Sequence, residues 1–256
     1  FVDVEALASL IRSDTTLVSV MAVNNEIGSI EPIEAISELL ADKPTISFHV
    51  DAVQALAKIP TEKYLIERVD FATFSSHKFH GVRGVGFVYI KSGKRIMPLL
   101  TGGGQEGDYR STTENVAGIA ATAKALRLSM EKLDIFTSKT GQMKSVIRQA
   151  LLDYPDIFVF SDEEDFAPHI LTFGIKGVRG EVIVHAFEDY DIFISTTSAC
   201  SSKAGKPAGT LIAMGVDKDK AQSAVRLSLD LENDMSQVEQ FLTKLKLIYN
   251  QTRKVR

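Results

Sequence analysis

The sequence predicts an α/β protein with a mostly parallel β-sheet in its first part and a smaller α+β arrangement in its second. Over the first half of the chain, short apolar runs rich in β-branched residues alternate with amphipathic stretches, a pattern typical of parallel strands joined by helices. After a long helical stretch, short strands surround isolated helices, which indicates a second domain.

The first part is expected to contain four strands. Strands are predicted at residues 16–23, 45–50, 70–74 and 86–90. A helix is predicted from Pro32 to about Leu40, because proline is favoured in the first turn of a helix. Since the strands read as continuously apolar, both faces of the sheet are expected to be buried.

The second part begins with two long helices. They are predicted from Glu114 to about Leu133 and from about Thr137 to Leu152. Later strands are predicted at 157–160, 169–173, 191–194 and 224–229, with helices at 180–188 and 236–249. We expect two domains that meet within the first long helix, at residues 1–125 and 126–256.

The composition disfavours several classes of protein. The net charge of -4 argues against a basic face for nucleic acid, and no apolar run approaches the roughly 20 residues of a membrane span. The single cysteine, Cys200, excludes an intramolecular disulfide and a multi-cysteine metal cage, and it fits a reducing cytoplasm. The chain opens without methionine or a signal sequence, so we expect an N-terminal segment to be missing.

Polar residues follow two of the predicted strands. Asp51 ends one strand within HVDAVQ at 49–54, and Lys78 follows the next within SSHKFHG at 75–81. Open α/β sheets bind ligands at this edge, where a lysine can form a Schiff base with a carbonyl cofactor and a carboxylate can keep a pyridinium nitrogen protonated. Alternatively, Asp51 caps a helix from Ala52, and Lys78 is a surface charge.

Two loops carry further candidates. Three glycines in TGGGQE at 101–106 precede RSTTEN at 110–115 and are compatible with a phosphate cradle, although Thr113 is equally a helix N-cap. Cys200 lies among small, polar and basic residues at 195–207, which favours an exposed, ionisable thiol over a buried one.

Two further polar residues, Arg226 and Asn25, are candidates for ligand contacts. Arg226 interrupts an apolar run and needs a partner, either a substrate carboxylate or an internal salt bridge. Asn25, within VNNEIG at 23–28, follows another strand and either contacts a cofactor or forms a turn.

Together these motifs resemble the cysteine desulfurases, pyridoxal-phosphate enzymes of the class V aminotransferase group. The matching motifs occur in order from Asn24 to Arg226: NNEIG, HVDAVQ, SSHK, GGGQE, RSTTEN and SAC. The resemblance implies a type I PLP-transferase fold, in which residues 1–125 are the C-terminal part of the cofactor-binding large domain and 126–256 the small domain. The spacing from Cys200 to Gly215 resembles the subgroup with a long cysteine loop.

The resemblance also implies a site for pyridoxal 5'-phosphate. Lys78 would bind the cofactor covalently, and Asp51 would pair with the ring nitrogen. Further contacts would come from Asn25 and Gln54 near the ring hydroxyl, Ser75 and His77 at the phosphate, and Thr113 at the phosphate of the neighbouring subunit in a homodimer.

The implied reaction converts L-cysteine to L-alanine. Arg226 would bind the substrate carboxylate, and Cys200 would accept the sulfur as a persulfide. An acceptor protein, either an iron-sulfur scaffold or a tRNA-thiolation enzyme, would take the sulfur in the cytoplasm, with no metal, membrane or direct nucleic-acid contact. Alternatives are a selenocysteine lyase, another class V aminotransferase, or an inactive fragment that serves as a dimerisation or sulfur-carrier module.

The chain departs from the family pattern at several positions. Ser76, Val82 and Thr112 stand where glycine, proline and glycine are usual, and Thr197 replaces a common glycine before SAC.

Overall fold

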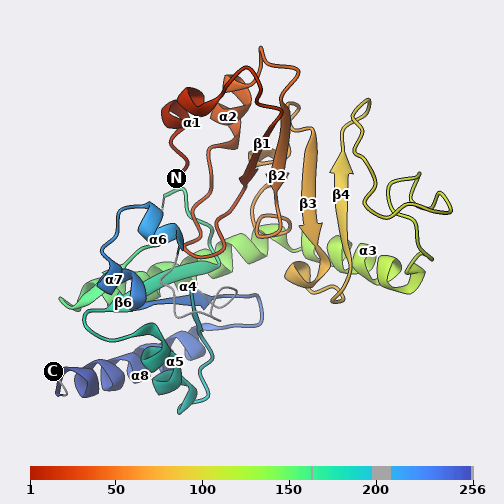
Figure 1. Ribbon diagram of the computed structural model, residues 1–256. Coiled ribbons are helices and arrows are strands. Elements are labelled where there is room, and N and C mark those ends of the chain that lie inside the picture. The colour runs from red at the N-terminus through yellow and green to blue at the C-terminus, as the bar shows by residue number, and fades with distance from the viewer. Residues whose placement is uncertain (163, 198–208, 255–256) are drawn as a thin grey trace. The chain divides into compact units, whose positions relative to one another are not determined.

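A four-stranded sheet forms the centre of the first of two units in the computed structural model (Figure 1). The structure describes residues 1–162, 164–197 and 209–254. The first unit contains Phe1–Val23 and Glu31–Leu133, and the second contains Asn24–Ile30 and Asp134–Arg256.

The sheet of the first unit is mostly parallel, as predicted. Its order is β1 (Leu17–Met21), β2 (Ser47–Asp51), β3 (Phe71–Ser75) and β4 (Gly86–Ile90). The first three strands pair in parallel, and β4 pairs antiparallel with β3. Helices α1 (Val4–Leu10), α2 (Ile33–Leu39) and α3 (Val116–Met130) and the 3-10 turn η1 (Thr61–Lys63) belong to the same unit.

The prediction that both sheet faces are buried is wrong: β4 consists largely of exposed residues, β1 is exposed in part, and β2 is buried on one face. In β2, Phe48 and Val50 are fully buried, whereas the alternating residues Ser47, His49 and Asp51 are half-buried. Since successive side chains of a strand point to opposite faces, one face of β2 joins the core and the other is polar.

A short 3-10 turn, η2 (Ser76–Phe79), follows β3 and packs on α3. Ser76 is fully buried, and its Oγ lies 2.8 Å from Thr122 Oγ1 on α3. Thr122 donates its own hydroxyl hydrogen to the Gly118 carbonyl at 2.7 Å, so Ser76 is the donor of the pair. The Gly81 N–H donates to the Ser76 carbonyl at 2.9 Å and closes the turn.

Ion pairs hold the opposite end of β3. The Asp70 carboxylate accepts from the Phe48 N–H at 2.9 Å and lies 2.8 Å from Arg68 and 3.3 Å from Lys94. Burial raises the pKa of Asp70, but the Phe48 hydrogen bond and the two cations outweigh it, so the pKa is lowered.

The second unit is built on an antiparallel sheet. Its order is β5 (Ile157–Val159), β6 (Ile170–Ile175), β8 (Ala224–Ser228) and β7 (Ser195–Thr196). Its helices are α4 (Leu133–Leu152), α5 (Gly180–Glu188), α6 (Gly209–Ala213), α7 (Lys218–Gln222) and α8 (Met235–Lys254). Its core joins α4, α5 and α8 to β6 and β8, and Phe241 stacks on Phe187 with ring centroids 4.9 Å apart.

Residues 191–194 do not form the predicted strand, and this part of the chain pairs with β8 only from Ser195, where β7 begins. Asp191 has a left-handed φ of 58°, which an extended strand does not accommodate, and Phe193 is 78% exposed. The apolar residues of this segment therefore do not form a buried strand.

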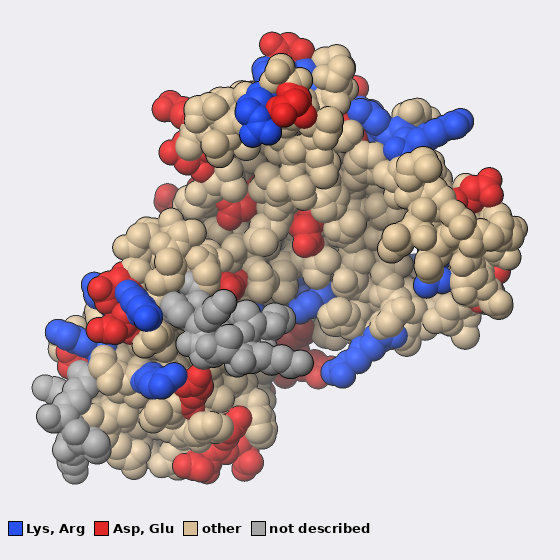
Figure 2. Space-filling model, viewed as in Figure 1, with Lys and Arg blue, Asp and Glu red and all other residues tan. Residues whose placement is uncertain are grey.

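In the part of the chain that the structure describes, no helix is long and apolar enough to cross a membrane. Basic and acidic side chains are interspersed on the face drawn in Figure 2.

We predict that Asp70→Asn lowers the free energy of unfolding by about 3 kcal/mol, because Arg68 and Lys94 lose their buried counter-charge. In the parent, the contribution of Asp70 is complete above the unfolded pKa of about 3.9 and is lost as pH falls through the lower folded pKa. The variant should lack this acid-dependent loss in urea titrations across pH. Asp42→Asn, which removes an exposed pair with Lys43, is the control; an equal effect of both changes would contradict the prediction.

We predict that Gly81→Ala destabilises the turn after β3. A Cβ at Gly81 would lie 1.9 Å from Ser76 Oγ and 3.0 Å from the Ser76 carbonyl oxygen, so the free energy of unfolding should fall by about 1–3 kcal/mol. Ser76→Ala removes the nearest atom, so the double variant should lose less than the sum of the single changes. Gly209→Ala is the control because a Cβ there meets no atom within 4 Å; additive losses at positions 76 and 81 would refute the clash.

Candidate active site

Lys78 lies in the turn η2, directly after β3. The turn is held on both sides of this lysine: Phe79 is fully buried, its carbonyl accepts from Ser129 Oγ at 3.1 Å, and His80 ends the turn with a left-handed φ of 65°. Lys78 itself is half-buried, and the neighbouring His77 is exposed. The backbone that carries the amine is therefore fixed, while the side chain reaches solvent.

Asp51 is the last residue of β2. It pairs in register with Met21 on β1 and with Thr73 on β3, and its side chain is half-buried. Oδ1 accepts from the Val53 N–H at 3.0 Å, so the capping contact exists, although residues 53–58 form turns rather than a helix. One carboxylate oxygen is thus engaged by the backbone.

The parallel pairing of β2 and β3 brings several predicted residues to one edge. Ser75 ends β3 two residues after Thr73, and η2 with Lys78 continues from it. Gln54 lies in the turn after β2 and is half-buried. The carboxyl ends of both strands therefore carry a carboxylate, an amine, a hydroxyl, an imidazole and an amide: Asp51, Lys78, Ser75, His77 and Gln54.

Thr113 is exposed and lies before α3. The prediction that it caps this helix is wrong, because the side chain of Asn115 accepts from the Gly118 N–H at 3.1 Å. The glycine loop before it contains positive φ angles at Gly102, Gly104 and Gly107, which agrees with the expectation of unusual backbone dihedrals.

Arg226 and Asn25 meet in the second unit. Arg226 lies in β8 opposite Thr172 and Ser195, and its Nη1 donates to the Asn25 carbonyl at 2.7 Å. The neighbouring Asn24 accepts from the N–H groups of Glu26 and Ile27, which holds the turn. Asn25 therefore belongs to a turn and contacts the strand arginine through its backbone.

Cys200 lies outside the described residues. The chain on either side of it is anchored in the second unit, by β7 before it and α6 after it. Thr210 in α6 donates its N–H to Glu26 at 3.1 Å, and its hydroxyl accepts from Asn24 at 3.3 Å.

No role was predicted for His49, whose two ring nitrogens contact hydroxyl groups on the two neighbouring strands. Its Nδ1 lies 2.7 Å from Ser19 Oγ on β1 and its Nε2 lies 3.1 Å from Thr73 Oγ1 on β3. Burial lowers the pKa of His49, and the charge of Asp51 opposes this effect. The spacing of His49 and Asp51, two residues apart on one strand, is the sequence signal that places them on one face.

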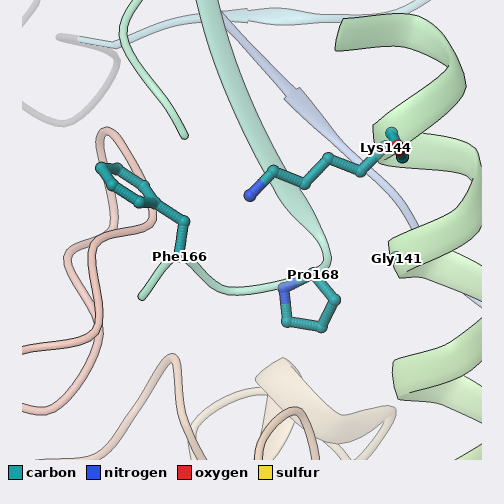
Figure 3. A pocket seen from close by; sticks show the side chains of 5 residues that line it. Gly141, Lys144, Phe166 and Pro168 are labelled. Carbon is teal, nitrogen blue, oxygen red and sulfur yellow. The ribbon is translucent and has the colours of Figure 1, made fainter. Parts of the chain in front are cut away.

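A cavity of about 290 Å³ in the second unit contains none of the predicted residues (Figure 3). Gly141, Lys144 and Ser145 of α4 line it together with Phe166 and Pro168. The buried Lys144 donates to the Ala167 carbonyl at 3.0 Å, and its Nζ lies 5.5 Å from the centre of the Phe166 ring. These contacts bind the α4 lysine to the loop before β6.

The donor set of the first unit fits a pyridoxal-type cofactor. Such a group presents a basic ring nitrogen, an aldehyde and a phosphate. The half-buried Asp51 suits the nitrogen, the amine of Lys78 suits the aldehyde, and Ser75 and His77 suit the phosphate. All four lie at the carboxyl ends of adjacent parallel strands, where open α/β sheets bind ligands.

Several known proteins are similar to this chain. A "NifS/IcsS protein homolog" of Lactobacillus delbrueckii is 50% identical over 99% of the chain, and a "Cysteine desulfurase IscS" of Clostridium botulinum is 37% identical over 100%. The chain covers 66% and 64% of these relatives, so it spans slightly less than two thirds of their length.

A solved structure described as a NifS-like protein is 36% identical to this chain, with a TM-score of 0.88. The match covers 97% of this chain and 65% of the solved one. This likeness confirms the predicted fold class. Residues 1–241 match the family described as Aminotransferase class-V. The chain therefore belongs to the class-V aminotransferase family.

Proposed function

We propose that this chain acts as a pyridoxal-phosphate-dependent cysteine desulfurase, which converts L-cysteine to L-alanine and leaves a persulfide on Cys200. The observation that carries the proposal is the pairing of β2 with β3, because it brings Asp51 and the Lys78 turn to one sheet edge. Family membership and relatives named cysteine desulfurase support it. Because the chain spans about two thirds of those relatives, its own activity is part of the proposal.

The cofactor residues have distinct tasks. Pyridoxal phosphate, when bound, supplies an electron-withdrawing ring that stabilises negative charge on the substrate carbon. Asp51, as a carboxylate, holds a proton on the ring nitrogen. Lys78 would hold the aldehyde of the cofactor, and its amine would be the group that moves the α-proton of the substrate. Ser75 and His77 hold the phosphate.

The substrate residues belong to the second unit. Arg226 binds the substrate carboxylate, a role for which a guanidinium is suited because it donates two parallel hydrogen bonds. Its contact with the Asn25 carbonyl holds one end of the guanidinium. By the resemblance, Asn25 and Gln54 are assigned to the ring hydroxyl.

Cys200 performs the sulfur transfer. Its thiolate attacks the substrate sulfur, so an S–S bond forms while the Cβ–S bond of the substrate breaks and its electron pair stays with carbon. That carbon takes up a proton, which balances the proton lost from the Cys200 thiol. The products are alanine and a persulfide on Cys200.

The persulfide is then passed to an acceptor protein. Relatives bearing the name IscS favour an iron-sulfur scaffold, and a tRNA-thiolation enzyme is the other acceptor considered. The proposal includes a cytoplasmic homodimer, in which Thr113 reaches the phosphate bound by the neighbouring subunit.

We predict that Lys78→Ala abolishes covalent attachment of the cofactor and lowers alanine production by roughly 10²–10⁴-fold, because the anchoring and proton-moving amine is gone. Mass spectrometry after incubation with pyridoxal phosphate and borohydride reduction locates the labelled lysine. Lys124→Ala, an exposed lysine on α3, is the control and should keep the label on Lys78. A label that persists in Lys78→Ala at another lysine would refute the assignment.

We predict that Cys200→Ser retains the cofactor but forms no persulfide, because a hydroxyl cannot accept the sulfur. Persulfide-specific alkylation is unambiguous here because the chain contains one cysteine. Alanine production from cysteine should fall to background. Alanine production at the parent rate would instead favour another class V aminotransferase, and a preference for selenocysteine would favour a lyase.

A further inference from the structure

His49 bridges three strands on the polar face of the first sheet. Its two ring nitrogens contact Ser19 on β1 and Thr73 on β3, at 2.7 Å and 3.1 Å. Ser19 is its register partner, and Phe48 and Val50 on either side point into the core. The imidazole is therefore held in one plane across the sheet.

Both contacts are with hydroxyl groups, which donate or accept a hydrogen bond. A neutral imidazole, with one N–H and one lone pair, is satisfied by this pair of partners in either tautomer. Burial also favours the neutral form, since it lowers the pKa of His49. The site thus accepts an uncharged ring without an unpaired nitrogen.

Asp51 lies next to His49 and Thr73 on the same sheet face. Asp51 lies two residues after His49, so both side chains project from the same sheet face, and its register partner on β3 is Thr73. Among the described residues, Asp51 is the charged group whose field acts on His49. The facing positions of β1 and β3 carry side chains that do not titrate near neutral pH: Leu17, Ser19, Met21, Phe71 and Thr73.

We infer that His49 is a positioning residue that acts through Asp51: the hydroxyl-held imidazole controls the net charge at the end of β2. A neutral ring leaves the Asp51 carboxylate free to hold a proton on a ring nitrogen. A protonated ring, still held by its two hydroxyl partners, places a positive charge on the same sheet face and offsets the charge of that carboxylate. The link to the cofactor rests on the proposed function, whereas the coupling between His49 and Asp51 does not.

The coupling is tested without cofactor, by NMR titration of the five histidines in the 256-residue chain and in Asp51→Asn. Because Asp51 raises the pKa of His49, its neutralisation should lower that pKa further. His185, exposed on α5 and 2.8 Å from Glu188, is the internal control, and its ring resonances should be the same in both proteins. An unchanged His49 titration would overturn the inference.

Cofactor retention is the second readout. Binding of pyridoxal phosphate is measured by its absorbance between pH 8 and pH 5.5. In the parent, binding should weaken as the pH falls through the pKa of His49. His49→Gln cannot be protonated and should lose this step, whereas His185→Gln should keep it. Equal profiles for the parent and His49→Gln would overturn the inference. Absence of binding in all three proteins at every pH would refute the proposed function, and the NMR titration would still decide the coupling.

Discussion

The parallel register between β2 and β3 is the constraint on which the candidate site depends. It sets Asp51 beside Thr73, so that both strands end at the same edge and the turn with Lys78 begins one residue beyond Ser75. A shift of this register by one residue would turn the polar side chains of β2 into the core and the apolar ones out of it. Burial of Phe48 and Val50 therefore also determines where the carboxylate of Asp51 points.

Tertiary contacts fix the two ends of β3 differently. Just before its start, the buried carboxylate of Asp70 accepts a backbone hydrogen bond and forms ion pairs with Arg68 and Lys94. At its end, Ser76 connects the turn to α3 through Thr122, with Gly81 leaving room for the hydroxyl. The resemblance led us to expect glycine at position 76; the Ser76 hydroxyl instead bonds to Thr122, so serine is compatible with the turn that carries Lys78.

The second unit contributes its residues through a different kind of scaffold. Its antiparallel sheet places Arg226 on a strand between β6 and β7, next to the turn that contains Asn25. The same turn contacts the start of α6 through Glu26, downstream of the cysteine segment. One short piece of chain, Asn24–Ile30, thereby connects the predicted substrate arginine with the element that follows Cys200 in sequence.

Much of this arrangement follows from local patterns. The strand at Gly86–Ile90 and the helix at Gly180–Glu188 were predicted with their observed bounds, because apolar spacing and turn residues act over a few positions. Lys78 and Asp51 were proposed as site residues because each follows a recognisable strand. The strand expected at 191–194 does not form because Asp191 has a left-handed φ. Thr113 was considered as an alternative N-cap of α3, but Asn115 forms the capping hydrogen bond.

The bridge at His49 required the folded sheet. The alternation of His49 and Asp51 along one strand is a local signal that they share a face, although no role was predicted for His49. The sequence contained no sign that Ser19, thirty residues earlier, and Thr73, twenty-four residues later, would hold the two ring nitrogens. Strand order and register are set by packing over the whole unit, and such long-range pairings are not encoded in any short stretch of residues.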